Sequence, residues 1–172
     1  MTAVGKHMIQ GFGRRLSLSR TLVLIALSLA ILYAMGCVPD AGKAMLRIYD
    51  WKTGTVYVEA PARKNSRLYF GWVHSQEKIA WNEYYHIGEG LNLVLDAITF
   101  PAFGAGIPEN TGRLCYVKDG LIHMEEINQN FAELVWLNSH TATRDIILDG
   151  VLIVRGSELP HHARVRLLIE KR

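Results

Sequence analysis

The chain contains little of what would place it in a familiar functional class. Only two cysteines occur among 172 residues, which excludes a disulfide-rich scaffold. No Gly-x-Ser-x-Gly segment is present, so the nucleophile turn of an α/β-hydrolase is missing. Beyond residue 38 the sequence has no amphipathic helical pattern of ordinary length and no long internal repeat, which argues against helical bundles and solenoids.

A basic surface is missing as well. The formal charge of +3 comes from 19 Lys and Arg against 16 Asp and Glu, but four of these basic residues lie within residues 1–36, which contain no acid. The remaining residues carry 15 basic against 16 acidic side chains, a net charge of −1. Nucleic acids require a basic stripe on the folded domain, so we expect no nucleic-acid partner.

The N-terminus has the layout of a secretory signal or signal-anchor. A basic stretch ends at Arg20, an apolar run covers residues 22–38, and Pro39 follows. As a helix, this run of 17 residues reaches about 25 Å, slightly less than a relaxed membrane-spanning helix. The basic flank predicts that the N-terminus stays in the cytoplasm. We therefore expect a signal peptide or membrane anchor in 1–38, a linker in 39–44 and an exported domain in 45–172.

Cys37 ends a segment that resembles a bacterial lipobox, because the small residue Gly36 precedes it. One interpretation is a lipoprotein in which Cys37 is lipidated, and the other is an uncleaved signal-anchor with an incidental cysteine. Both place the domain on the extracytoplasmic face of the membrane. In either case Cys115 remains single, so we expect no disulfide and interpret Cys115 as a small core residue.

The exported part is dominated by alternating apolar and polar residues, which predict short β-strands. Strands are expected at 45–50, 55–59, 68–74, 79–87, 91–100, 113–118, 121–127, 131–137, 146–148, 151–154 and 163–169. Asp119-Gly120 and Asp149-Gly150 are typical of two-residue hairpin turns. The polar segment 60–66 reads as a loop. These patterns predict an all-β fold, an antiparallel β-sandwich or a barrel-like meander, preceded by an N-terminal hydrophobic helix.

The pair His74-Ser75 invites a hydrolase interpretation, since a nucleophilic serine needs a base within hydrogen-bond reach. Neighbouring residues on a strand point to opposite faces, however, so His74 is poorly placed to activate Ser75. The interpretation that we favour is structural, with His74 ending a strand and Ser75 lying in a turn. We therefore assign no catalytic residue.

Glu83 lies in a strand whose alternation places it on one face with Ile79, Trp81 and Tyr85. An unpaired carboxylate among aromatic side chains would be costly, so we predict a hydrogen bond or ion pair between Glu83 and His74 across a hairpin. Such a pair would fix the strand register or form one wall of an anion or metal site.

The other histidines that could join a metal site are His86, which should face away from Glu83, His140, and the exposed-loop pair His161-His162. They lack the spacing of a metal motif, so we expect no metal and no cofactor.

The segment Gly104-Ala105-Gly106-Ile107-Pro108 lacks the lysine and the following helix of a phosphate-binding loop. Its glycines suit a tight connection, and its free amides could alternatively form an anion nest. Because loops on rigid sheets often carry function, we expect a ligand or partner surface formed by His74, Ser75, Glu83, Gly104, Gly106 and Pro108.

The sequence contains a series of features whose order along the chain resembles that in a family known as domain of unknown function 1850. The matching features are the hairpin from Leu46 to Val58, Val73-His74-Ser75 with Glu77, Glu83 flanked by aromatics, Gly90-Leu91, Phe103–Pro108, Ser139-His140-Thr141 leading into Ile146-Ile147-Leu148, and the Asp149-Gly150 hairpin. The likeness covers about residues 45–155. The resemblance implies a small exported or membrane-attached bacterial protein whose gene accompanies TRAP transporters of the TAXI type. It implies no established activity and no set of active residues.

These observations lead us to expect a non-enzymatic, membrane-tethered extracytoplasmic protein. It would be an accessory of a TAXI-type TRAP solute transporter, in contact with the permease or its solute-binding protein. The alternative is a periplasmic module that binds a small ligand or a metal without an obligatory protein partner. A periplasmic hydrolase is a third, weaker interpretation.

Overall fold

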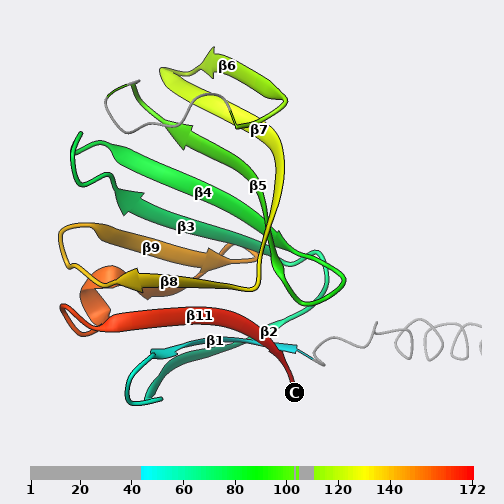
Figure 1. The fold of residues 1–172 in the computed structure, drawn as a ribbon, viewed down its shortest axis with the longest axis vertical. Coiled ribbons are helices and arrows are strands. Elements are labelled where there is room, and N and C mark those ends of the chain that lie inside the picture. The colour runs from blue at the N-terminus through cyan, green and yellow to red at the C-terminus, as the bar shows by residue number, and fades with distance from the viewer. Residues whose placement is uncertain (1–43, 103, 105–110) are drawn as a thin grey trace, which may run out of the picture. The chain divides into compact units, whose positions relative to one another are not determined.

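The computed structural model describes residues 44–102, 104 and 111–172. This part of the chain forms eleven strands and one short 3-10 helix, η1 (Figure 1). Their bounds are β1 Ala44–Asp50, β2 Val56–Ala62, β3 Arg67–Val73, β4 Ala80–Ile87, β5 Leu93–Phe100, β6 Leu114–Lys118, β7 Leu121–Phe131, β8 Glu133–Leu137, β9 Thr143–Leu148, β10 Val151–Arg155, η1 Gly156–Glu158 and β11 Arg164–Lys171. Every strand expected from the alternating pattern is present, so the predicted all-β class is confirmed.

The strands form two antiparallel sheets. The smaller sheet has the order β2-β1-β11-β8, and the larger has the order β10-β9-β3-β4-β5-β7-β6. Of the two predicted arrangements, the two-sheet sandwich is therefore the one formed. A simple meander is not, because β9 pairs with β3 and β11 pairs with β1, which are distant in sequence.

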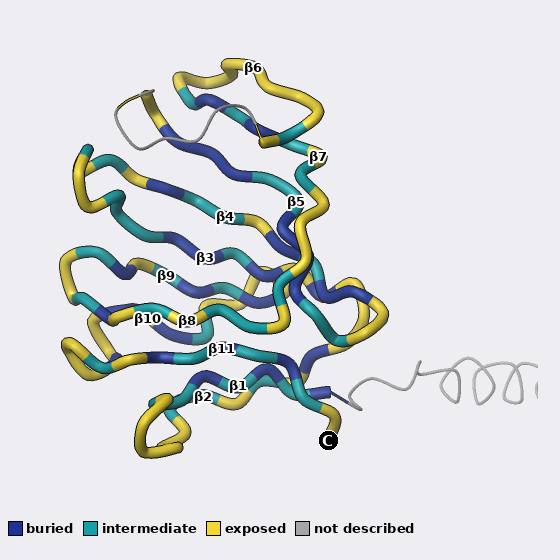
Figure 2. Tube along the Cα trace, in the orientation of Figure 1, coloured by how far each residue is buried: buried dark blue, intermediate teal, exposed yellow. Residues whose placement is uncertain are grey.

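One apolar core fills the space between the sheets. On β1 and β11, Leu46, Ile48, Val165 and Leu167 are fully buried, and they alternate with more exposed residues. Much of β3 and β4 in the larger sheet shows a similar alternation, whereas β5 is buried over most of its length (Figure 2). Because each fully buried aliphatic or aromatic side chain stabilises the fold by about 1.5–3 kcal/mol, this core is the main source of stability.

The chain passes from the larger to the smaller sheet between β7 and β8, at Ala132. Just before this point, Glu126 and Asn128 adopt left-handed backbone angles (φ 56° and 54°). There the pairing of β7 with β5 shifts, so that Ala97 lies opposite Glu125 and Leu95 lies opposite Gln129. Such a bulge bends and twists a strand, and it directs β8 away from the larger sheet.

Both predicted two-residue hairpins are present. Asp119 and Gly120 have φ values of 52° and 76°, and Asp149 and Gly150 have values of 49° and 80°, as type I′ turns require. The carboxylate of Asp149 has a second role, because it accepts hydrogen bonds from Ser66 Oγ and the Arg67 amide, each at 2.8 Å. The turn therefore also holds the start of β3.

Two local predictions are wrong, and both concern sheet edges. The segment 60–66, expected as a loop, continues β2 as far as Ala62 and includes Pro61. Proline is tolerated there because β2 is an edge strand with unpaired amides on one side. Cys115, expected in the core, is an exposed free cysteine, because the edge strand β6 is exposed along its whole length (Figure 2).

The N-terminal predictions lie outside the described residues. They concern the signal peptide or anchor in 1–38, its hydrophobic helix and Cys37. The last residue of the expected linker, Ala44, already belongs to β1. Within the residues that the structure describes, no helix is long and apolar enough to cross a membrane.

Candidate functional site

The inner face of β4 carries an acidic side chain, Glu83, among aromatic rings. Trp81, Tyr85 and Ile87 are buried on this face, and Glu83 is partly buried between them. The predicted alternation of β4 is therefore confirmed. Glu83 lies directly opposite Phe70 of β3 and opposite Ile98 of β5, so the carboxylate is surrounded by apolar neighbours in its own sheet.

The hydroxyl of Tyr85 donates a 2.7 Å hydrogen bond to Glu83 Oε2. Burial raises the pKa of Glu83 above its usual value, while the Tyr85 hydroxyl and the indole N–H groups of Trp72 and Trp81 act to lower it. Burial also raises the pKa of Tyr85, and the neighbouring Glu83 charge raises it further. Compared with a carboxyl group in water, Glu83 therefore favours its neutral form. The neutral phenol of Tyr85 holds it through the hydrogen bond.

The predicted pair between His74 and Glu83 is wrong. The hairpin register places Phe70 opposite Glu83, whereas the His74 amide bonds to the carbonyl of Ile79, four residues from Glu83. The His74 ring lies against Trp72 and Trp81, with centroids 5.7 and 5.8 Å away. His74 Nδ1 accepts a long hydrogen bond of 3.5 Å from the Glu77 amide, so this imidazole stabilises the end of the hairpin.

The other residues of the expected surface separate into two groups. Ser75 is exposed in the β3–β4 turn, and Gly104 is exposed beside the same turn. A Cβ on Gly104 would lie 2.5 Å from the carboxyl carbon of Glu77, so a larger residue there would require the Glu77 side chain to move. Gly106 and Pro108 lie outside the described residues. His74 and Gly104 thus both lie near Glu77 at the β3–β4 turn, and none of His74, Ser75 and Gly104 is among the residues that line the cavity beside Glu83.

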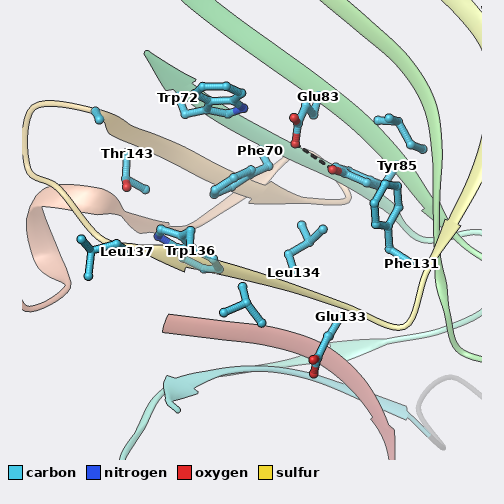
Figure 3. Close-up of a pocket in the computed structure, with 13 residues that line it drawn as sticks. Phe70, Trp72, Glu83, Tyr85, Phe131, Glu133, Leu134, Trp136, Leu137 and Thr143 are labelled. Carbon is cyan, nitrogen blue, oxygen red and sulfur yellow. Dashed lines mark hydrogen bonds between the residues drawn. The ribbon is translucent and has the colours of Figure 1, made fainter. Parts of the chain in front are cut away.

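Glu83 instead faces a cavity of about 470 Å³ between the two sheets (Figure 3). Figure 3 shows Glu83 and Tyr85 of β4 on one side and Leu134 and Trp136 of β8 on the other. The described residues that line the cavity are Phe70, Trp72, Glu83, Tyr85, Leu95, Phe131, Glu133, Leu134, Val135, Trp136, Leu137, Ala142 and Thr143. All five residues of β8 contribute, and of the described residues expected at the site from sequence only Glu83 does.

The cavity is apolar with an acidic bias. The described residues of its lining include two glutamates and no lysine, arginine or histidine. Glu133 is already compensated, because its carboxylate forms an ion pair with Arg166 of β11. The indole N–H of Trp136 is buried and has no hydrogen-bond partner among the described residues.

The described residues contain no group of three or more His, Cys, Asp or Glu side chains placed to hold a metal ion. His86 does face away from Glu83, as predicted, and its Nδ1 bonds to Asp96 at 2.8 Å. His140, His161 and His162 are exposed and stack on one another through their rings.

The fold and this cavity define a small β-sandwich with an acidic, aromatic pocket between its sheets. The chain belongs to the family described as domain of unknown function (DUF1850), whose model matches residues 68–153. The matched segment includes every residue that lines the pocket, and it begins after the β1–β2 hairpin that we expected to share the resemblance. No curated protein and no solved structure matches the chain.

Proposed function

We propose that the chain is a non-enzymatic binding module that holds a small organic molecule between its two sheets. The observation that supports this most directly is the cavity of about 470 Å³, whose walls include five aromatic side chains around the carboxyl group of Glu83. Pockets for small molecules usually enclose about 300–1,000 Å³ and combine apolar walls with a few polar groups. The sequence left this function open as the alternative, a module that binds a small ligand.

The geometry favours binding over catalysis. Ser75 is exposed in a turn, and the His74 ring packs on Trp72 and Trp81. Within the pocket, the Thr143 hydroxyl accepts a hydrogen bond from the Ser139 amide at 3.4 Å, and no imidazole lines the cavity to activate it. A nucleophile with an adjacent base is therefore not part of the lining.

A thermal-shift screen of small organic molecules on the full-length chain tests the proposal, because a ligand that binds the folded state raises its apparent stability. Leu134→Trp is expected to fill the cavity and abolish the shifts. The matched control is Val117→Trp, which adds the same ring at an exposed position on the edge strand β6. The proposal would be contradicted if no molecule in the screen raised the apparent stability, or if the stability shifts persisted in Leu134→Trp.

We further propose that the module works on the extracytoplasmic face of the membrane, tethered through residues 1–38. The support is the basic segment followed by an apolar run in this region. Labelling with a fatty-acid analogue distinguishes the two tethers. Label that is lost in Cys37→Ala supports a lipid anchor, and a membrane-associated chain without label supports a peptide anchor. A chain found outside the membrane fraction would contradict both.

The partner that we propose is a TRAP-type transporter of the TAXI class, through its permease or solute-binding protein. This proposal rests on the family resemblance and on the tether, which would raise the effective concentration of the module near such a partner. Crosslinking in cells followed by affinity purification should recover transporter components. Recovery of none under several growth conditions would contradict the partner and leave the pocket proposal unaffected.

A further inference from the structure

The charged side chains of the pocket restrict the charge that its occupant can carry. This inference rests on the proposed binding function. The charged side chains of the lining are Glu83 and Glu133. Arg166 neutralises Glu133 from outside the lining, whereas Glu83 forms no ion pair with any described residue. The uncompensated charge of the cavity is therefore negative whenever Glu83 is ionised.

The aromatic walls favour a positive charge at the same place. Phe70, Trp72, Tyr85, Phe131 and Trp136 line the cavity from both sheets. Phe70 and Trp136 meet across the sandwich with ring centroids 5.1 Å apart, and Tyr85 meets Phe131 edge-on at 6.1 Å. The faces of aromatic rings carry negative potential, so they attract cations and most strongly cations of low hydration.

Other occupants fit less well. An organic anion would lie against the carboxyl group of Glu83 and the ring faces, and the described part of the lining has no basic side chain to pair with it. A metal ion needs several converging ligands, and the described residues provide no such group. A neutral apolar molecule could fill the space but would leave Glu83, whenever it is ionised, without a counter-charge.

We propose that this pocket binds a small organic ammonium ion, whose charged nitrogen lies among the aromatic rings beside Glu83. A charged ammonium group occurs in free amines, in quaternary ammonium solutes and in the headgroups of lipids. The cation compensates the desolvated carboxylate of Glu83, and the rings replace the weakly held water of an alkylated ammonium group.

Three probes of nearly equal shape and different charge test the class of ligand. They are choline, its neutral isostere 3,3-dimethylbutan-1-ol and the anion 3,3-dimethylbutanoate. Binding to the full-length chain is followed by calorimetry and by tryptophan fluorescence, since Trp72 and Trp136 line the cavity. Choline should bind about tenfold more tightly than the neutral isostere, and the anion more weakly than either. Glycerophosphocholine is added as a headgroup probe, and tighter binding than choline would assign the ammonium group to a lipid.

Glu83→Gln keeps the size of the side chain and an oxygen for the Tyr85 hydroxyl, and it should lower choline affinity about tenfold without changing the affinity of the neutral isostere. The matched control is Glu59→Gln, an exposed glutamate on β2 whose partner Arg47 retains Glu170. If Glu83→Gln does not fold, the comparison of the three probes on the unmodified chain still decides the question.

The outcomes separate this inference from the proposed function. Equal or tighter binding of the neutral isostere or of the anion, abolished by Leu134→Trp, would overturn the ammonium ligand and retain the pocket as a binding site. A choline affinity that is unchanged in Glu83→Gln would also overturn it. Absence of binding by every probe, together with an empty thermal-shift screen, would overturn both.

Discussion

The hydroxyl of Tyr85 donates to Glu83 Oε2 over 2.7 Å, between two residues that share the inner face of one strand. The contact is local, because residues i and i+2 of a strand point to the same side. It does not depend on how the two sheets are joined. This relationship makes Glu83 a hydrogen-bonded carboxyl group rather than an unsatisfied one, and its consequences can be measured directly.

Tyr85→Phe removes the hydrogen bond and keeps the ring. Because the hydroxyl helps to lower the pKa of Glu83, the substitution should raise that pKa further. The free energy of unfolding should fall by about 1–2 kcal/mol at neutral pH. Infrared titration of the carboxyl stretch measures the first effect and denaturant unfolding measures the second. Tyr84→Phe is the control, since Tyr84 is exposed on the outer face of β4, and an identical response of both variants would contradict the prediction.

Glu83→Gln should make the protein more stable at neutral and alkaline pH. Burial raises the pKa of Glu83 in the folded state above its ordinary value of 4.5, so the folded chain holds this proton more tightly than the unfolded chain. The contribution of Glu83 to stability is therefore fully present below pH 4.5 and is lost as the pH rises through the folded pKa. Each unit by which the pKa is raised corresponds to about 1.4 kcal/mol.

The measurement is the difference in unfolding free energy between Glu83→Gln and the unmodified chain at a series of pH values. This difference should be near zero in acid, increase above pH 4.5 and then reach a plateau. Glu59→Gln, which removes an exposed ion pair with Arg47, should change stability by less than about 1 kcal/mol throughout. A difference that does not vary with pH would show that Glu83 is not desolvated in the folded state.

The elements that could be predicted from sequence are those specified by local pattern. Alternation along β4 placed Glu83 on the aromatic face, and Asp149-Gly150 identified a hairpin. The position of β8 could not be predicted, because it depends on the bulge at Glu126 and Asn128 and on pairing with β11, about 30 residues later. The opposite wall of the pocket was missed for this reason.

The wrong pairing of His74 with Glu83 has a related cause. In a hairpin, the register decides which residue of one strand lies opposite each residue of the other. A wrongly assumed register therefore assigns a residue the wrong partner. The turn after His74 closes on Ile79, which places Phe70 opposite Glu83. The alternating pattern correctly predicted the face of β4 on which the Glu83 carboxylate lies, but it did not predict the hydrogen-bond partner of Glu83.

Asn138 is fully buried where β8 ends, and it connects this strand to the segment around η1. Its Nδ2 donates to the carbonyls of Gly156, Leu159 and Pro160 at 3.0–3.1 Å. Asn138→Ala removes these hydrogen bonds, while the carbonyls of Leu159 and Pro160 keep their contacts with His140 Nε2 and the Ala163 amide. The substitution should lower the free energy of unfolding by about 1–3 kcal/mol. Asn138→Asp should be more damaging, because it places a carboxylate against three carbonyl oxygens.

Urea unfolding of the two Asn138 variants measures these losses. Ser157→Ala is a suitable control, because Ser157 lies in the same 3-10 helix and is exposed. Stability of Asn138→Ala within about 0.5 kcal/mol of the unmodified chain would contradict a clamping role.

The stacked histidines predict that the fold loses stability on mild acidification. The ring centroids of His140 and His161 are 4.7 Å apart, and those of His161 and His162 are 3.8 Å apart. Desolvation lowers the pKa of His161 below its ordinary value of 6.5, and the charges of His162 and His140 lower it further. The unfolded chain therefore takes up a proton at a higher pH than the folded chain does. Stability falls as the pH drops below 6.5, and this loss stops once the folded state is protonated too.

His161→Asn tests this directly, because its side-chain oxygen can still accept the hydrogen bond that the His140 amide donates to His161 Nδ1. The decline in unfolding free energy below pH 6.5 should be shallower in this variant than in the unmodified chain. His162→Asn should give an intermediate slope, since it removes one neighbouring charge and asparagine tolerates the left-handed backbone (φ 61°) found there. Thermal unfolding between about pH 5 and 8 provides the comparison, in the range where an ordinary histidine titrates. Equal slopes in the three proteins would show that the imidazole of His161 titrates alike in the folded and unfolded states.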